Sequence, residues 1–188
     1  MKIRYVIEKI IASILVLFLS PMILLICISI KLTSSGEIFF WSRRVGIKNN
    51  IFLMPKFSTM KPETPKVATH LLRNPTQYYT KVGSILRKTS LDEIPQLFSI
   101  IMGDMSFIGP RPALFNQDDL IKLRTEKGIH HMKPGITGWA QVNGRDQLTI
   151  SEKVFFEREY LNNRSFLMDM RIIWLTLIKV VFRDNITH

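Results

Sequence analysis

The chain of 188 residues carries 26 Lys and Arg against 15 Asp and Glu, a formal net charge of +11. Its length is typical of one domain, and its hydrophobic share of 46% is too high for a disordered chain. The single cysteine, Cys27, excludes an internal disulfide and a cysteine-based zinc site. The basic excess indicates a polyanionic partner, and composition leaves open whether this is nucleic acid, an anionic membrane or a phosphorylated substrate.

The first part of the chain contains an apolar segment, Ile10–Ile30, of 21 positions without a formal charge. A helix of that length would just cross a bilayer. Ser20 and Pro21 lie at its middle, where Pro removes a backbone hydrogen bond and predicts a kink. Both flanks are basic, so the distribution of Lys and Arg favours neither direction of crossing. We therefore expect residues 1–33 to form a re-entrant membrane helix kinked at Ser20-Pro21, in preference to a straight span or a signal peptide.

Residues 34–188 are expected to form a single compact polar domain, and the chain as a whole is predicted to be α+β and mostly helical. Two short aromatic and β-branched runs, Glu37–Trp41 and Asn50–Met54, predict a small hairpin. The segment Lys61–Thr80 is rich in Pro, Thr and Asn and is expected to be a loop with at most one helical turn. The glycine-punctuated segment Lys133–Leu148 predicts a structured loop with a short strand.

Apolar spacing predicts helices in the rest of this domain. We place them at Thr80–Lys88, Leu91–Met102, Asp118–Lys127, Glu152–Asn162 and Asp169–Phe182. The last has a wide apolar face together with Arg171, Lys179 and Arg183, which is typical of an amphipathic helix in a membrane interface. An ordinary helix packed on the core is the alternative.

Two adjacent carboxylates, Asp92 and Glu93, follow the cations Arg87 and Lys88. One interpretation is structural, because Ser90 and Glu93 have the spacing of a helix capping box. The other is catalytic. If a helix begins near Asp92, its dipole and the nearby cations keep that carboxylate ionised, as a metal ligand or a nucleophile toward phosphorus must be.

Two further segments carry groups that bind phosphates or nucleotides. Arg111 lies between two prolines in Gly103–Pro112, and a stiffly held guanidinium suits a phosphate, although it can equally be a surface Arg on a rigid turn. The segment Lys133–Asp146 combines glycines with Gln141 and Arg145, a composition found in nucleotide-binding loops and also in plain turns. Neither common phosphate-binding glycine motif is present in the sequence.

Together these segments resemble the monotopic phosphoglycosyl transferases, also called the bacterial sugar transferase family, in their minimal short form. The resemblance rests on SLDEIPQL, GDMSFIGPRP, PGITGWAQVNGR and SFLMDMRI, in that order, and extends from Ser20-Pro21 to about Phe182. It implies transfer of a sugar phosphate from a UDP-sugar to polyprenyl (undecaprenyl) phosphate with release of UMP. That reaction is the first membrane step in the assembly of glycoconjugates such as an O-antigen, a capsule or a glycoprotein glycan.

The resemblance also implies roles for particular residues. Asp92 is the expected nucleophile, which forms an aspartyl-phosphosugar intermediate in a ping-pong cycle. Glu93 is its partner carboxylate, which either helps to bind Mg²⁺ or assists the acceptor. Mg²⁺ is the expected cofactor, with Asp92 and Glu93 as its ligands. The expected substrate-binding residues are Lys56, Arg87, Arg111, Gln141 and Arg145. An anionic carboxylate that attacks an anionic diphosphate needs such cations to offset the repulsion.

Other implications concern context. Asp169 matches a family carboxylate with a structural or metal-proximal role, and Ser58 stands where the family commonly has a basic residue. Short members often take N-acetylated 6-deoxy amino sugars, so such a donor is expected. The expected location is the cytoplasmic face of the bacterial inner membrane, on an anionic lipid bilayer and without a nucleic-acid partner; a homodimer stays open.

Two other functions are compatible with parts of the sequence. A membrane-anchored basic binding module without catalysis would account for the charge and the apolar segment, but not for the Asp92-Glu93 pair. A membrane phosphatase would use the same Asp92 nucleophile and pass the phosphoryl group to water. Replacement of Asp92 and the need for a lipid acceptor distinguish these alternatives from a transferase.

Overall fold

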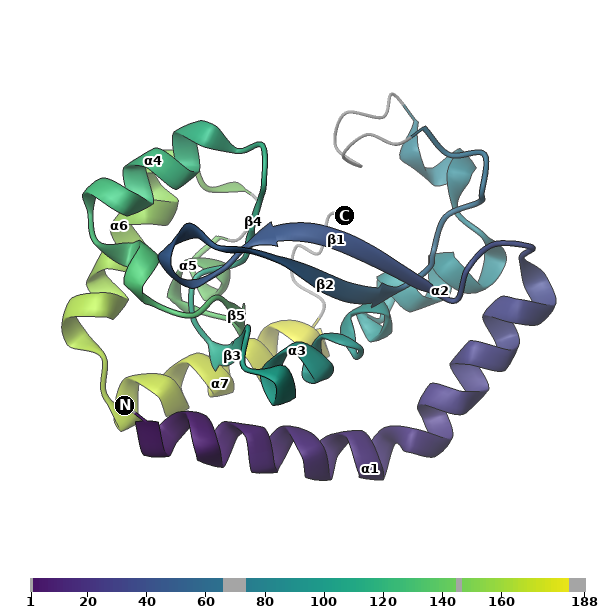
Figure 1. Cartoon of the computed structure of the whole chain (residues 1–188), viewed down its shortest axis with the longest axis horizontal. Coiled ribbons are helices and arrows are strands. Elements are labelled where there is room, and N and C mark those ends of the chain that lie inside the picture. Colours follow the sequence, from purple (N-terminus) through teal and green to yellow (C-terminus); the bar gives the residue numbers. More distant parts are fainter. Residues whose placement is uncertain (1, 66–73, 145–146, 183–188) are drawn as a thin grey trace.

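The computed structural model describes residues 2–65, 74–144 and 147–182. It is α+β and mostly helical, as predicted. One long helix, α1, runs below the body and bends upward at one end, while a hairpin of β1 and β2 crosses the opposite side (Figure 1). The helices α4 and α6 lie at one end of the molecule and α2 lies at the other (Figure 1).

The long helix α1 spans Lys2–Thr33 and contains Pro21. Pro21 has no N–H to donate to the Leu17 carbonyl, and the Ser20 hydroxyl donates to that carbonyl instead, at 2.7 Å. Leu17 therefore keeps a donor although the helix is bent (Figure 1). The predicted kink at Ser20-Pro21 has this chemical basis.

Both ends of α1 are attached to the same body. Near the beginning of the helix, Arg4 forms an ion pair with Asp169 of α7, with 2.7 Å between Nη1 and Oδ2. Near its end, Ile26 and Ile30 are buried in a cluster with Phe57. The bend between these attachments is compatible with a re-entrant helix, because neither end leads away from the domain.

The predicted hairpin is present, with longer strands than expected. β1 spans Phe39–Val45 and β2 spans Ile51–Phe57, joined by a 3-10 turn at Ile47–Asn49. The strands are antiparallel, and β4 (Ala113–Leu114) adds to the free edge of β1. Two further short strands, β3 (Ser106–Ile108) and β5 (Gly135–Thr137), pair in parallel.

The helices follow the predicted order, with two corrections. The short helix α5 (Trp139–Val142) lies within Lys133–Leu148, where the sequence predicts a loop with a short strand. The predicted helix Leu91–Met102 is divided into a 3-10 turn at Leu91–Glu93 and helix α3 at Gln96–Met102. Pro95 is the reason, because it cannot donate a backbone hydrogen bond and here begins α3 as its N-cap residue. The remaining elements are a 3-10 turn at Pro75–Tyr78, α2 (Lys81–Lys88), α4 (Asp118–Glu126), a 3-10 turn at Ile129–His131, α5 (Trp139–Val142), α6 (Ile150–Asn163) and α7 (Phe166–Phe182).

The capping-box interpretation of Ser90 and Glu93 is wrong. Ser90 adopts a left-handed conformation with φ of 57°, and its side chain makes no capping hydrogen bond. A capping box does occur in α6, between Thr149 and Glu152. The Asp92-Glu93 pair therefore lacks the structural explanation that the sequence offered for it.

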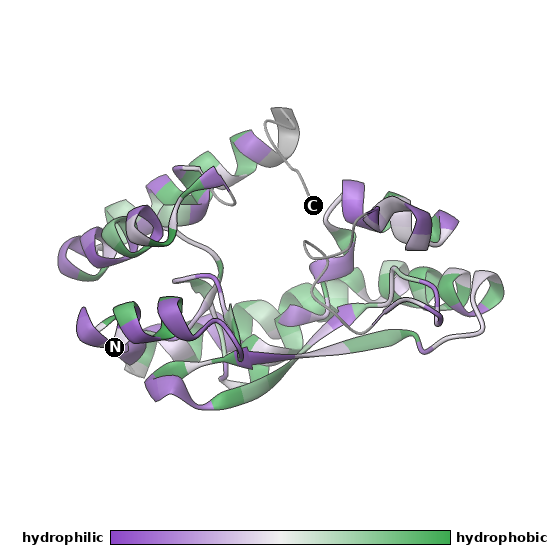
Figure 2. Cartoon of the chain, turned by 90° about the horizontal axis from the view of Figure 1, so that it is seen from above, coloured by the Kyte–Doolittle hydropathy of each residue, from purple (hydrophilic) through white to green (hydrophobic). Residues whose placement is uncertain are grey.

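Apolar side chains are exposed along α1 and α7. Among the described residues, one helix, Ile3–Thr33, is long and apolar enough to cross a membrane. The ribbon of α1 is hydrophobic along much of its length (Figure 2). On α7, Phe166, Leu167 and Trp174 are all more than 60% exposed, which is more than a helix packed on a core would leave in water. This exposure is consistent with the amphipathic interface helix predicted near the end of the chain.

Candidate active site

The site lies where the 3-10 turn Leu91–Glu93 meets the inner face of the hairpin. Lys56 comes from β2, Asp92 and Glu93 from the turn, and Arg111 from the loop between β3 and β4. The Lys56 ammonium lies 2.6 Å from Glu93 Oε1, and Arg111 Nη2 lies 3.6 Å from the same oxygen. Side chains from β2 and from the loop between β3 and β4, which are far apart in the sequence, therefore meet at the Glu93 carboxylate of the turn.

Asp92 is nearly enclosed. Only 6% of the residue is exposed, and its buried Oδ1 atom has no hydrogen-bond partner among the described residues. Burial raises the pKa of the Asp92 carboxyl, the Lys56 charge opposes this rise, Glu93 adds to it and Arg87 opposes it. An oxygen with an unused lone pair beside two cations has the character of a nucleophile or of a metal ligand.

The cations around Asp92 are held in place by their own contacts. Arg87 donates from Nε to Thr59 Oγ1 at 2.9 Å and from Nη1 to Tyr79 Oη at 3.0 Å. The Arg87 guanidinium also lies 4.7 Å from the centre of the Tyr79 ring. Lys56 is held by Glu93, and burial lowers the pKa of its ammonium while Glu93 opposes that change. Both cations are thus fixed beside Asp92.

A small pocket adjoins these groups and brings in residues that the sequence analysis did not single out. Its lining combines the predicted Lys56, Glu93 and Arg111 with Arg44 and Gln96. Gln96 is only 3% exposed and follows Pro95 at the beginning of α3. The sequence alone does not single out Arg44. The register of the hairpin does so, because it places Arg44 opposite Phe52 across β1 and β2.

Other predicted site residues lie elsewhere. Gln141 is on α5, and both polar atoms of its amide are buried without a partner among the described residues. Asp169 accepts a hydrogen bond from Tyr160 Oη at 2.6 Å besides its ion pair with Arg4, which is a structural arrangement. Ser58 is half-buried, and its backbone N–H donates to Ile38 O. Arg145 lies outside the described residues.

Comparison with known proteins assigns the chain to a family. Residues 1–183 match the family described as bacterial sugar transferase. The chain belongs to the bacterial sugar transferase family. This confirms the resemblance carried by the Asp92-Glu93 and Arg111 motifs, and it places nearly the whole chain within the family domain.

Individual members of the family are also similar to the chain. The uncharacterized sugar transferase EpsL of Bacillus subtilis is 38% identical over 178 residues, which are 93% of this chain and 86% of EpsL. UDP-glucose:undecaprenyl-phosphate glucose-1-phosphate transferases of Xanthomonas campestris and Escherichia coli are each 38% identical, over 93% and 92% of this chain. The chain spans only 38% and 39% of the length of these two relatives.

Proposed function

We propose that this chain transfers a sugar 1-phosphate from a UDP-sugar to a polyprenyl phosphate such as undecaprenyl phosphate, with release of UMP. The observation that carries the proposal is the buried, unpartnered Oδ1 of Asp92 beside Lys56. The printed activity of the Xanthomonas and Escherichia relatives supports the same donor and acceptor classes. The product would be a polyprenyl-diphosphate sugar.

The reaction proceeds by two displacements at one phosphorus. Asp92 Oδ1 attacks the phosphorus that bears the sugar, the P–O bond to the bridging oxygen breaks, and UMP leaves with that oxygen. A phosphate oxygen of the polyprenyl phosphate then attacks the same phosphorus, and the bond to Asp92 breaks. Asp92 returns as a carboxylate, and the double displacement gives ping-pong kinetics.

Positive charge near the reacting phosphorus lowers the repulsion between the carboxylate and the diphosphate. The charges of Lys56 and Arg87 act on Asp92, and Arg111 Nη2 lies 3.6 Å from the neighbouring Glu93. Because these groups are held before the substrate arrives, they need not reorganise during the reaction. Glu93 orients Lys56 and Arg111 at once, since its Oε1 atom lies near both.

The carboxylates also suit Mg²⁺. No group of three or more His, Cys, Asp and Glu side chains that could hold a metal occurs within residues 2–65, 74–144 and 147–182. Mg²⁺ commonly uses only one or two carboxylates and completes its coordination with substrate phosphates and water. Asp92 and Glu93 provide that number, and Asp92 Oδ1 is an orphaned oxygen. When bound there, Mg²⁺ would neutralise charge on the diphosphate.

The membrane provides the acceptor. A polyprenyl phosphate keeps its tail in the bilayer and its phosphate at the surface, so the site has to lie at the headgroup plane. We infer that α1 enters the membrane and returns to the cytoplasmic side of the bacterial inner membrane, while the exposed residues of α7 lie in the interface. The attachment of both ends of α1 to one body supports this arrangement.

The decisive experiment is UMP release by the purified chain with Mg²⁺ and undecaprenyl phosphate. The donor panel includes UDP-glucose, because the named relatives use glucose, and UDP-linked N-acetylated 6-deoxy amino sugars. Release of UMP over repeated turnovers that requires both the lipid and Asp92 would support the proposal, with Asp92→Asn as the inactive control. Without the lipid, only a single stoichiometric release of UMP should accompany formation of the adduct. Repeated turnover without the lipid, with transfer to water, would indicate a phosphatase. Intact mass should show a phosphosugar adduct on the wild type and none on Asp92→Asn.

A further inference from the structure

Arg44 is a second arginine of the active-site pocket. It lies on β1, opposite Phe52 of β2 and Leu114 of β4. Its Nε atom donates to Ser42 Oγ at 2.9 Å, and its Nη1 atom donates to the Pro112 carbonyl at 3.1 Å. Because Pro112 directly follows Arg111, the Arg44 side chain braces the loop that carries Arg111.

Arg44 forms no salt bridge with a carboxylate in the part of the chain that the structure describes, although the charge of Glu93 raises the pKa of its guanidinium. Glu93, the acidic residue in the lining of the pocket, is engaged by Lys56 and Arg111 through its Oε1 atom. Burial lowers the pKa of the Arg44 guanidinium to about 10, as does the charge of Arg111, so Arg44 stays protonated at neutral pH. A partly buried cation without its own counter-ion is costly unless a ligand provides the negative charge.

The unused donors of Arg44 are available to such a ligand. Its Nη2 atom has no hydrogen-bond partner among the described residues, and it is not one of the enclosed atoms that lack a partner. Arg44 lines the pocket together with Lys56, Glu93 and Arg111. Arg44 therefore lines the pocket and keeps a guanidinium donor that no described residue uses.

Contacts place Arg44 with Arg111. Arg44 Nη1 donates to the carbonyl of Pro112, the residue after Arg111, and Arg111 Nη2 lies 3.6 Å from Glu93 Oε1. Arg44 and Arg111 both line the pocket, and Asp92 is not part of its lining, so the two guanidiniums lie together and apart from the nucleophile. In a displacement at phosphorus the leaving oxygen departs on the side opposite the attacking oxygen.

We propose that Arg44 binds the phosphate of the UMP leaving group, beside Arg111. The proposal rests on the proposed transferase function and adds to it a residue for the far end of the diphosphate. Two guanidiniums there would stabilise the charge that develops on UMP as the bridging P–O bond breaks. UMP carries this phosphate and uridine lacks it, so a comparison of how the nucleotide and the nucleoside bind tests the contact directly.

The test compares binding of UMP and of uridine to the purified full chain by calorimetry, for the wild type, Arg44→Gln and Arg44→Lys. Loss of a charged hydrogen bond should weaken UMP binding about 10- to 100-fold in Arg44→Gln and leave uridine binding unchanged. Arg44→Lys keeps a charge but loses the two-sided geometry, so it should fall between the wild type and Arg44→Gln. The KM for undecaprenyl phosphate should not change.

Arg43→Gln is the matched control, because Arg43 is the next residue and lies outside the pocket, over the Phe115 ring at 4.7 Å. It should bind UMP like the wild type. An unchanged ratio of UMP to uridine affinity in Arg44→Gln, with an active wild type, would overturn this proposal alone. Equal losses for UMP and uridine would also overturn it, because they indicate a structural role. A wild type that releases no UMP with any donor would overturn the transferase function and this proposal together.

Discussion

The Lys56 ammonium lies 2.6 Å from Glu93 Oε1, and this ion pair is largely shielded from water, since the two side chains are only 16% and 14% exposed. The pair places a fixed positive charge beside Asp92. Glu93 also lies near Arg111, so one carboxylate connects the two cations of the site. The site is an electrostatic unit, and its members should not act independently.

Replacement of Lys56 by Met should lower kcat strongly and destabilise the fold. Removal of Lys56 leaves Glu93 buried without the ammonium that lies 2.6 Å from its Oε1 atom, which should cost about 2–4 kcal/mol of unfolding free energy. Chemical denaturation and UMP release measure the two effects. Glu93→Gln provides the complementary variant, and the double variant should be less destabilised than the sum of the two single variants. A strictly additive result would show that the pair is not coupled.

The pH dependence of kcat/KM should report the raised pKa of Asp92. Asp92 attacks as a carboxylate, so activity should fall as the pH falls through its pKa, which burial holds above the usual value of about 4. Since Lys56 opposes that rise, Lys56→Met should move the acidic limb of the profile to still higher pH. A pH profile of UMP release for both proteins measures this. An acidic limb at the ordinary pKa of Asp would contradict the enclosure of Asp92.

The sequence analysis predicted the elements that have a strong local pattern. The hairpin of β1 and β2, α2 and α4 follow from apolar spacing and from turn residues. The observed bounds of α2 and α4 are close to the predictions, whereas both strands of the hairpin extend beyond the predicted runs. The strands β3, β4 and β5 have only two or three residues each, too few for an alternation to show. They exist because separate segments of the chain pair with one another.

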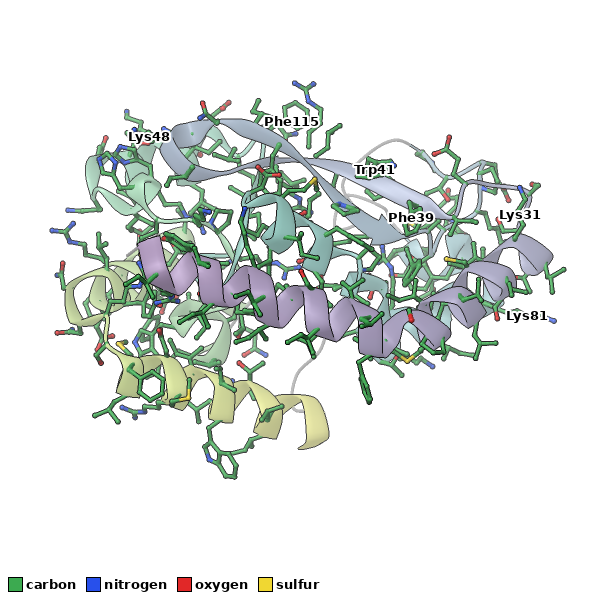
Figure 3. The ribbon with its side chains drawn as sticks, turned by 60° about the horizontal axis from the view of Figure 1, so that its bottom comes forward. Lys31, Phe39, Trp41, Lys48, Lys81 and Phe115 are labelled. Atoms are coloured by element: carbon green, nitrogen blue, oxygen red, sulfur yellow. The ribbon has the colours of Figure 1, made fainter. Side chains whose placement is uncertain are left out.

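The candidate site likewise contains residues that the sequence motifs predicted and one residue that they missed. Asp92, Glu93, Lys56 and Arg111 were predicted from their motifs, and the structure brings them together. Arg44 was missed because Arg43 and Arg44 are equivalent in the sequence until the strand is paired. A shift of the register by one residue would exchange the two side chains between the pocket and the outer face. On the outer face, Arg43 lies over the ring of Phe115, which Figure 3 labels near the hairpin together with Trp41 of β1.

The contact between Arg4 and Asp169 should anchor the beginning of α1. Asp169→Asn removes the ion pair and keeps a hydrogen-bond acceptor for Tyr160, so it should cost about 1–3 kcal/mol of unfolding free energy. Arg4→Gln should cost a similar amount, and a double-mutant cycle in detergent should show positive coupling. The UMP affinity should be unchanged in Asp169→Asn, because Asp169 contacts Arg4 and Tyr160 rather than the pocket. A large loss of UMP affinity at full stability would instead make Asp169 part of the site.

Helix α2 approaches the strand end so closely that Gly83 cannot carry a side chain. A Cβ atom at Gly83 would lie 2.1 Å from the Thr59 carbonyl oxygen, and Thr59 accepts the hydrogen bond that holds Arg87. Gly83→Ala should therefore cost about 1–3 kcal/mol and also lower kcat by displacing Arg87. Ser84→Ala is the control from the same helix. Unaltered stability and turnover in Gly83→Ala would contradict the close packing.

The kink at Pro21 should decide the topology of α1. Pro21→Ala restores an N–H for the Leu17 carbonyl, so the helix should straighten and favour a membrane-spanning form. Because Cys27 is the only cysteine in the sequence, a Cys27→Ser background allows single cysteines at Lys2 and Ser35. In right-side-out and inverted vesicles, an impermeant thiol reagent should label both positions from the cytoplasmic side in the re-entrant form. Pro21→Ala should move Lys2→Cys to the opposite side, whereas Ser13→Ala, a hydroxyl deletion distant from the kink, should not. Labelling of the two positions from opposite sides without the Pro21 change would show that α1 spans the membrane.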